Sequence, residues 1–398
     1  MKINSNYSNL QKSYLFARIS EEVKAHKARN PGREVISLGI GDVTLPLAPA
    51  VVTAMKEAVC EMGEAATFRG YGEYEGELFL RQAVCGHYAR KGVELDEGEV
   101  FVSDGSKSDA GNILDIFSAD NTVLIPDPVY PVYVDTNIMA GRKIVYMDGN
   151  EGNGFLPLPD GDVRADIIYL CSPNNPTGAV YSKEELEKWV GYAIENDAVI
   201  LFDSAYEAFV RDEGMPTSIY QVPGARECAI EFCSLSKTAG FTGTRCGYTI
   251  VPHGLERGGE ALNRLWMRRQ STKFNGVAYI VQRGAEAVFS GEGMAQAKGN
   301  IDYYMGNAKL VTDTLSALGI WHTGGCNSPY AWFKCPGGMA SWDFFGRLLA
   351  EANVVGTPGA GFGANGEGFF RLSAFGSREN VAEAMRRFKR FAEAIEVH

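Results

Sequence analysis

The amino-acid sequence predicts an α/β fold in which a large domain, built on a mostly parallel seven-stranded sheet, is joined to a smaller α+β domain. Seven short apolar runs lie between residues 100 and 251 and alternate with segments of helical periodicity. Most of these runs lack polar alternation, as strands covered on both faces do. The chain has 398 residues, of which 45% are hydrophobic, and this length favours two domains over one.

Changes of pattern along the chain suggest where these domains begin and end. After residue 262 the sequence is helical for a long stretch, and from about residue 308 it has the pattern of a second α+β unit, which ends in an amphipathic helix at 378–395. We expect the N-terminal arm to pack on this unit. The predicted division is an arm with part of the small domain at 1–45, a large domain at 46–290 and a small C-terminal domain at 291–398.

The elements before the sheet follow from periodicity and from turn-forming residues. Apolar residues recur at helical spacing at 14–28 and 78–90, and a helix is also expected at 50–62. The run VISLGI at 35–40 predicts a strand, which the glycines and prolines of GDVTLPLAP end. FRGYGEYEG at 68–76 has the glycines and aromatics of an ordered loop, although a plain surface loop is the alternative.

The predicted strands of the sheet are four to six residues long. They are VFVS at 100–103, TVLIP at 122–126, KIVYM at 143–147, DIIYLC at 166–171, AVILFD at 198–203, AIEFCS at 229–234 and GYTIV at 247–251. Ligands of open α/β sheets bind outside the carboxyl ends of the strands. The residues that follow each run are therefore the first candidates for a functional site.

Composition excludes several classes of function. The formal net charge of −11 opposes non-specific binding to nucleic acid or to an anionic membrane surface. No run approaches the ~20 apolar residues of a membrane span, and the N-terminus lacks the apolar core of a signal peptide, so we expect a soluble cytoplasmic protein. The scattered cysteines and histidines lack metal-ligand and disulfide spacing, and the cysteines are interpreted as reduced core residues.

Lys237 is the residue around which the candidate site is organised. It follows the strand predicted at 229–234, with the hydroxyls of Ser234 and Ser236 beside it. Most lysines lie on a solvated surface, but an amine at the carboxyl end of a buried strand is a candidate for Schiff-base formation. Arg245 adds a fixed cation eight residues on. An amine, two hydroxyls and a guanidinium together suit a phosphorylated aldehyde such as pyridoxal phosphate.

Other strand ends carry residues that are too specific for a generic turn. Ser106 and Lys107 precede a predicted helix whose free amides could hold a phosphate, although a solvated lysine is the alternative. Two prolines stiffen the chain around Tyr130, whose ring could stack on a planar cofactor or pack in the core. In SPNNPTG, Asn175 precedes a proline and is biased to an extended conformation that projects its amide.

Two charged residues stand in apolar contexts where they need partners. Asp203 ends a run of apolar residues, with Tyr206 beside it, and a protonated pyridine nitrogen would pair with its carboxylate; capping the next helix is the alternative. Arg371 in FFRLSAFG suits a substrate carboxylate or a structural ion pair. The glycine-rich TPGAGFGANG at 357–366 lacks the strand and helix of a dinucleotide loop and is predicted to be a loop near the substrate.

Taken in order, these motifs resemble those of the fold-type I aminotransferases of the aspartate aminotransferase superfamily, and most closely the LL-diaminopimelate aminotransferases. The motifs are SYLF at 13–16, LGIGDVTLPL at 38–47, RGYG at 69–72, SDGSK at 103–107, SPNNPTG at 172–178, the Asp203 and Tyr206 pair, SLSK at 234–237, TKFNG at 272–276 and FFRLSAFG at 369–376. The resemblance covers nearly the whole chain. It implies a homodimeric enzyme that depends on pyridoxal 5'-phosphate.

The resemblance also implies a role for each matched residue. Lys237 would bind the cofactor covalently and act as general base, Asp203 would pair with the pyridine nitrogen, and Arg371 would bind the substrate α-carboxylate. The other implied cofactor contacts are Tyr130 stacked on the ring, Asn175 and Tyr206 at its phenolic oxygen, and Ser106, Lys107, Ser234, Ser236 and Arg245 on the phosphate side, with Tyr71 from a second subunit. The other implied substrate contacts are Tyr14, Gly41, Tyr71, Lys107, Tyr130, Asn175 and Asn275.

The implied reaction converts LL-2,6-diaminopimelate and 2-oxoglutarate to tetrahydrodipicolinate and glutamate, or the reverse, in lysine biosynthesis. The family commonly has GPEQG after its RGY, whereas this chain has GEYEG at 72–76, with Tyr74 at the position of the usual acid. Either Glu73 or Glu75 binds the distal ammonium, or the substrate is another dicarboxylic or dibasic amino acid. A pyridoxal phosphate lyase of the same fold is a further alternative. A purely regulatory role is disfavoured because Lys237 is present and no basic DNA-binding domain is attached.

Overall fold

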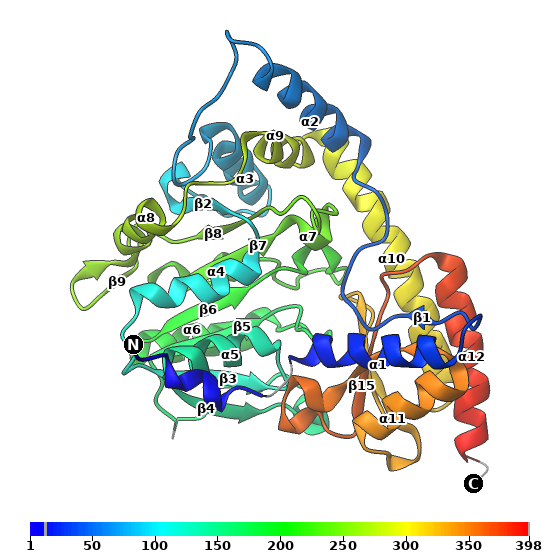
Figure 1. Cartoon of the computed structure of the whole chain (residues 1–398). Coiled ribbons are helices and arrows are strands. Elements are labelled where there is room, and N and C mark those ends of the chain that lie inside the picture. The colour runs from blue at the N-terminus through cyan, green and yellow to red at the C-terminus, as the bar shows by residue number, and fades with distance from the viewer. Residues whose placement is uncertain (12–13, 162, 397–398) are drawn as a thin grey trace.

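The protein, described by a computed structural model at residues 1–11, 14–161 and 163–396, is built on a seven-stranded sheet (Figure 1). In spatial order the strands are β2 (Val100–Ser103), β8 (Gly247–Ile250), β7 (Ala229–Ser234), β6 (Val199–Asp203), β5 (Ile167–Cys171), β3 (Thr122–Asp127) and β4 (Lys143–Asp148). β8 is antiparallel to both of its neighbours, and the remaining pairs are parallel. The mostly parallel sheet predicted from the apolar runs is therefore confirmed, with strand ends that differ by one residue at most.

Helices cover both faces of this sheet, which explains why its strands lack polar alternation. Leu124 and Ile168 pack in a core with α3, α6 and α9, whereas their chain neighbours Val123 and Ile167 pack in a second core with α4 and α8. β2, β5, β6, β7 and β8 are buried along their whole length. The helices around the sheet are α2 (Pro49–Met62), α3 (Leu78–Ala89), α4 (Ser106–Asn112), α5 (Pro131–Ala140), α6 (Lys183–Glu195), α7 (Leu235–Thr238), α8 (Leu262–Lys273) and α9 (Tyr279–Val288).

A second unit has its own sheet and its own core. Its sheet, in the order β11 (His322–Gly324), β12 (Tyr330–Lys334), β15 (Phe369–Ser373) and β14 (Thr357–Pro358), is antiparallel. Around it lie α10 (Gly291–Ala317), α11 (Ser341–Arg347), a π-helical turn (Leu348–Ala352) and α12 (Arg378–Glu396), with β1 (Ile36–Ser37) paired to β13 (Val354–Val355). In Figure 1 the long helix α10 runs from beside α2 and α9 to this unit.

The N-terminal arm divides between the two units. Leu15 and Ile19 of α1 (Leu15–Arg29) pack in the core of the second unit, as predicted. The first turn (Ser5–Asn9) instead lies against α5, where the Asn4 amide donates to the Met139 carbonyl at 2.9 Å. The expectation for these first residues was therefore wrong, because the last carbonyls of α5 have no helical partner and accept these amides.

Several short segments complete the chain. β9 (Glu256–Arg257) and β10 (Glu260–Ala261) form a small hairpin. Short 3-10 turns occupy Glu97–Glu99, Ile113–Ile116, Glu151–Asn153, Glu207–Phe209, Ile219–Gln221, Ala225–Glu227, Pro336–Gly338, Gly359–Phe362 and Ala364–Gly366. Among the helices of the described ranges, none combines the length and the apolar character needed to cross a membrane.

Three local predictions need correction. The strand predicted at 35–40 spans only Ile36–Ser37, which pair with the equally short β13. The helix predicted to follow Lys107 already begins at Ser106. Cys60 and Cys326 are exposed, so the description of the cysteines as core residues was wrong for these two.

Candidate active site

The predicted site residues meet in one cavity of about 360 Å³ at the carboxyl ends of the parallel strands. Those that line it are Tyr14, Gly41, Ser106, Lys107, Tyr130, Asn175, Asp203, Tyr206, Ser234, Ser236, Lys237, Arg245 and Arg371. Tyr71 and Asn275 are the two predicted residues outside it. The cavity lies where the two units face each other, because Arg371 belongs to β15 while Asp203 and Lys237 follow strands of the large sheet.

Lys237 lies in α7, the short helix that continues directly from β7. Ser234 begins this helix by accepting a hydrogen bond from the backbone amide of Ser236 at 3.1 Å. The Lys237 ammonium donates to the carbonyl oxygen of Gly41. Burial, opposed by the charge of Asp42, lowers the pKa of Lys237 to about 8. The neutral form is therefore a minority near pH 7, roughly a tenth of the amine, but far more abundant than for a lysine with the ordinary pKa.

Asp203 is a buried carboxylate at the end of β6. Its Oδ2 accepts the Tyr133 hydroxyl at 2.6 Å and its Oδ1 accepts the amide of Ala205 at 3.0 Å. No cation pairs with it among the described residues, and burial raises its pKa. The bond to Ala205 is cap-like, but the next turn begins only at Glu207, so capping does not account for the carboxylate. A buried acid that lacks a cation suits a cationic ligand atom.

Arg371 is 1% exposed, and its guanidinium faces the cavity beside aromatic rings. It donates to Asn175 Oδ1 at 2.5 Å and to the Gly39 carbonyl at 2.6 Å, and it lies 4.2 Å from the centroid of the Tyr330 ring. Its Nε has no partner, and the described part of the chain gives it no carboxylate. The alternative of a structural ion pair is therefore wrong, and a planar anion would complete its contacts.

Several hydroxyls and a guanidinium lie in the same cavity as Lys237. Arg245 donates to Ser236 Oγ at 3.2 Å and approaches Gly105 so closely that a Cβ there would lie 2.7 Å from Nη2. Gly105 has a φ of 128°, a conformation that favours glycine. With Ser106 and Ser234, these residues supply the donors that a phosphate group requires.

Two tyrosines of the cavity were not predicted. Tyr133 holds Asp203, and the Tyr330 hydroxyl lies 2.7 Å from that of Tyr206. Tyr133 could have been found, because it lies three residues after Tyr130 in a helix that follows a strand end. Tyr330 had no local signal, since it reaches the cavity from β12 of the second sheet.

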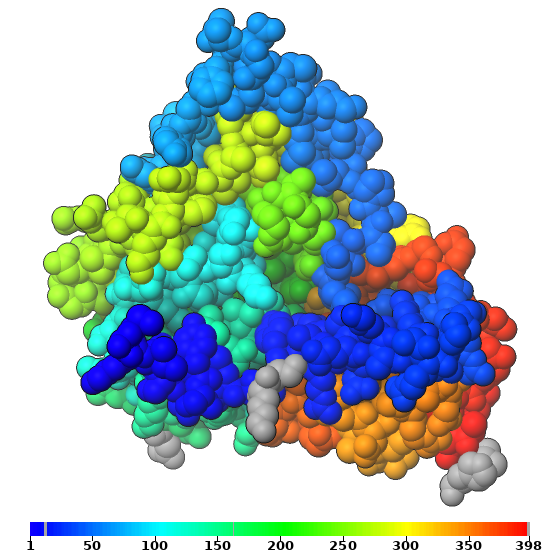
Figure 2. All heavy atoms as spheres, viewed as in Figure 1, coloured from blue at the N-terminus to red at the C-terminus, as the bar shows by residue number. Residues whose placement is uncertain are grey.

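Tyr71 and Asn275 lie on exposed loops. Tyr71 is 91% exposed, and Asn275 is exposed between α8 and α9. In the same loop as Tyr71, the Glu73 carboxylate forms an ion pair with Arg81. Residues 63–74 are exposed throughout, and Figure 2 shows this segment at the projecting tip of the molecule. The fold of a single chain therefore does not bring these residues to the cavity.

Comparisons with known proteins identify the fold and the class of enzyme. A family model described as aminotransferase class I and II matches residues 33–388. L,L-diaminopimelate aminotransferase from Chlamydomonas reinhardtii is 41% identical, with 99% of each chain covered and a TM-score of 0.93. Substrate-bound BacF from Bacillus subtilis is 28% identical, with 98% of each chain covered and a TM-score of 0.85. An aromatic aminotransferase from Pyrococcus horikoshii is 26% identical, with 96% of this chain and 100% of that chain covered and a TM-score of 0.83.

Proposed function

This chain belongs to the class I and II aminotransferases, and we propose that it transfers an amino group between LL-2,6-diaminopimelate and 2-oxoglutarate. We propose that the enzyme works in the lysine-forming direction, in which tetrahydrodipicolinate and glutamate are converted to LL-diaminopimelate and 2-oxoglutarate. The observation that carries the proposal is the 41% identity to L,L-diaminopimelate aminotransferase over 99% of both chains. Two cations that line the cavity, Arg371 and Lys107, match a donor with a carboxylate at each end.

Enzymes of this family depend on pyridoxal 5'-phosphate, and the residues of the cavity fit it. Asp203 is a buried acid without a cation, which suits a protonated ring nitrogen. Ser106, Ser234, Ser236 and Arg245 are grouped donors for a phosphate, and Lys237 is an amine placed for covalent attachment. We propose that Asn175 and Tyr206 contact the phenolic oxygen and that Tyr130 stacks on the ring. When bound, the cofactor supplies an electron sink for the substrate's α-carbon.

The chain's own residues carry out the binding and the proton transfer. Arg371 binds the α-carboxylate and so orients the α-carbon toward Lys237. Because the pKa of Lys237 is lowered to about 8, the neutral amine can remove the α-proton and return it elsewhere as general acid. The second half-reaction reverses these steps with the keto acid. We expect parallel lines in double-reciprocal plots of the initial rates. Intersecting lines would exclude a mechanism in which the two half-reactions alternate on one cofactor.

A panel of amino donors tests the substrate. The purified holoenzyme is assayed with LL- and meso-diaminopimelate, lysine, glutamate and aspartate, and we expect the highest kcat/KM with LL-diaminopimelate. If aspartate or lysine is better by more than about tenfold, or roughly 1.4 kcal/mol of transition-state binding, the specific assignment fails while the aminotransferase class stands. One keto acid formed for each donor consumed, without ammonia, excludes the lyase alternative.

The assembly and location are further parts of the proposal. Tyr71 and Asn275 are exposed, and we propose that they complete the active site of a second subunit in a homodimer. We also propose that the enzyme is cytoplasmic. The domain division at 1–45, 46–290 and 291–398 is retained, with the cofactor bound by the large domain. The two separate cores support this division, and α1, which shares the core of the small domain, fits the assignment of part of 1–45 to that domain.

A further inference from the structure

The two glutamates expected to bind the distal ammonium of the donor lie outside the cavities of the chain that holds them. The Glu73 carboxylate is already paired with Arg81, and its side chain is 55% exposed. Glu75 is half-buried at the base of the same loop, where its carbonyl accepts the amide of Val102 at 2.7 Å. Neither residue lines the active-site cavity or the cavity beside it. Within the chain that holds Arg371 and Lys107, an acid for the distal ammonium must therefore come from another element, whereas the two glutamates could act only in a second subunit.

A larger cavity of about 1110 Å³ adjoins the active site. Tyr14 and Lys107 line both cavities, so the Lys107 side chain lies at the boundary between them. Its ammonium lies 5.2 Å from the centroid of the Tyr14 ring. A donor that is anchored by Arg371 at one end and carries a second amino acid group at the other would extend toward this boundary.

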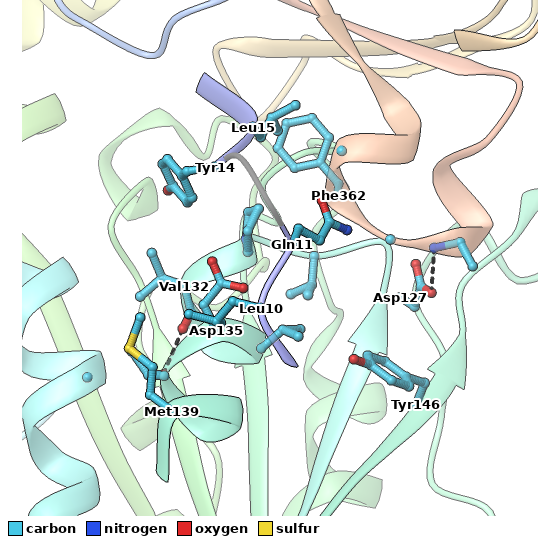
Figure 3. A pocket seen from close by; sticks show the side chains of 18 of the residues that line it. Leu10, Gln11, Tyr14, Leu15, Asp127, Val132, Asp135, Met139, Tyr146 and Phe362 are labelled. Carbon is cyan, nitrogen blue, oxygen red and sulfur yellow. Dashed lines mark hydrogen bonds between the residues drawn. The ribbon is translucent and has the colours of Figure 1, made fainter. Parts of the chain in front are cut away.

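Asp135 of α5 is the acid that lines the larger cavity next to Lys107. Figure 3 shows it on the same side of the cavity as Tyr14, with Asp127 on the far side. Its side chain is half-buried and, within the described ranges, makes no hydrogen bond or ion pair. Burial raises its pKa while the charge of Lys107 partly offsets this effect. Such a carboxylate gains stabilisation from a cation that approaches it.

The other two acids of this cavity are occupied by the protein itself. Asp127 accepts the amides of Ala364 at 2.9 Å and Asn365 at 3.3 Å, and Figure 3 shows one of these bonds as a dashed line. Asp148 accepts the side-chain amide of Asn365 at 2.7 Å. Lys107, like Asp135, makes no hydrogen bond or ion pair in the described part of the chain. One acid and one ammonium of the same cavity thus remain available for a ligand of opposite charges.

We propose that Asp135 is a specificity-determining residue that binds the distal ammonium of a diamino dicarboxylate donor, while Lys107 binds its distal carboxylate. The inference rests on the proposed function, because it concerns the same donor in the same site. A donor of the same length that lacks the distal amine, such as 2-aminopimelate, places no cation near Asp135 and meets its negative charge as a repulsion, so Asp135 disfavours it.

The test compares two donors that differ only in the distal amine. Holoenzyme and its Asp135→Asn variant are assayed with LL-diaminopimelate and with 2-aminopimelate. We expect Asp135→Asn to lower kcat/KM for LL-diaminopimelate by at least about tenfold, as loss of a charged hydrogen bond does. For 2-aminopimelate we expect kcat/KM to be unchanged or raised, because the repulsion is removed. Asp148→Asn is the matched control, and it should leave the ratio of the two donors within about twofold of the wild type.

Three results would overturn the inference. An equal loss of kcat/KM with both donors would assign Asp135 a structural role, and kcat/KM values equal to those of the wild type with both donors would assign it none. A selective loss in Glu75→Gln, with Asp135→Asn like the wild type, would assign the distal ammonium to the loop. Turnover of 2-aminopimelate by Asp135→Asn also shows that the variant is folded. If the wild type itself favours aspartate or lysine, the proposed function fails and the inference fails with it, which is distinct from a failure confined to Asp135.

Discussion

The residues at the strand ends and the residues on the exposed loops differ in what holds them. Lys237, Asp203 and Arg371 are each fixed by hydrogen bonds within the chain. Tyr71 and Asn275 are exposed, on loops that carry no core residue of the described chain. A buried charged group needs hydrogen-bond partners in the protein, and these partners fix its orientation. An exposed side chain has water as its partner and is not fixed in this way. One chain therefore fixes the groups to which we assign proton transfer and carboxylate binding, whereas the roles proposed for the loop residues require a second subunit.

Replacement of Lys237 should have the largest effect on the strand-end region. Lys237→Ala removes the general base, so kcat/KM should fall by at least about 10³-fold. It should also remove the near-ultraviolet absorption of the covalently bound cofactor. Lys188→Ala, at an exposed lysine on α6, is the control and should leave both unchanged. Full activity in Lys237→Ala would contradict the role given to the buried amine.

The next effect is on the pH dependence of stability, and it comes from a buried glutamate in β7. Glu231 of β7 is fully buried; its Oε2 accepts the Ser218 hydroxyl at 2.6 Å, and its Oε1 has no hydrogen-bond partner among the described residues. Burial raises its pKa to about 7. The folded state therefore keeps a proton that the unfolded state loses above about pH 4.5, so the stability from this group is complete below that pH and is lost as pH rises to about 7.

Glu231→Gln should abolish this dependence. We expect the variant to match the wild type below pH 4.5 and to exceed its free energy of unfolding by an amount on the order of 3 kcal/mol above pH 7. Urea unfolding at a series of pH values measures the difference. Glu227→Gln, at an exposed glutamate, is the control. Parallel pH profiles of wild type and Glu231→Gln would show that Glu231 keeps its ordinary pKa.

The proposed role of the exposed loops is tested by mixing two variants, each of which is defective by itself. Tyr71→Phe removes one hydroxyl from a phosphate contact and should lower kcat/KM by roughly 10- to 100-fold. If each site combines Tyr71 of one chain with Lys237 of the other, refolding Tyr71→Phe with Lys237→Ala should restore up to about one quarter of wild-type sites. Activity no greater than that of the diluted parents would show that sites are not shared.

The smallest effect is expected for the loop's ion pair. Glu73 is 55% exposed on its side chain, so Glu73→Gln should change the free energy of unfolding by less than about 1 kcal/mol. Arg81→Gln should cost more, because the buried guanidinium also donates to the carbonyls of Gly76 at 2.8 Å and Glu97 at 3.1 Å. Chemical denaturation compares the two. A larger loss in Glu73→Gln would mean that the loop is held more firmly than its exposure indicates.

The sequence by itself determined the large sheet and most of the site. Short apolar runs without alternation, bounded by turn-forming residues, are typical of strands buried on both faces, and parallel strands bring all their carboxyl ends to one edge. Ser106, Asn175, Asp203 and Lys237 therefore met in space although nothing local links them. The family motifs added the pairing of these residues with Arg371 from the second unit.

Tertiary structure alone decided the remaining features, because they depend on packing between elements that are distant in the chain. Arg371 and Asn175 are 196 residues apart, and their hydrogen bond exists only because the two units meet at the cavity. The position of Asp135 beside Lys107 likewise follows from how α5 and α4 pack on one sheet face. Exposure of Tyr71 and the occupation of Glu73 by Arg81 are also properties of the folded surface. Sequence patterns report the hydrophobic periodicity and the chemistry of each segment. The burial of a side chain, and whether it has hydrogen-bond or ion-pair partners, are set by its neighbours in space.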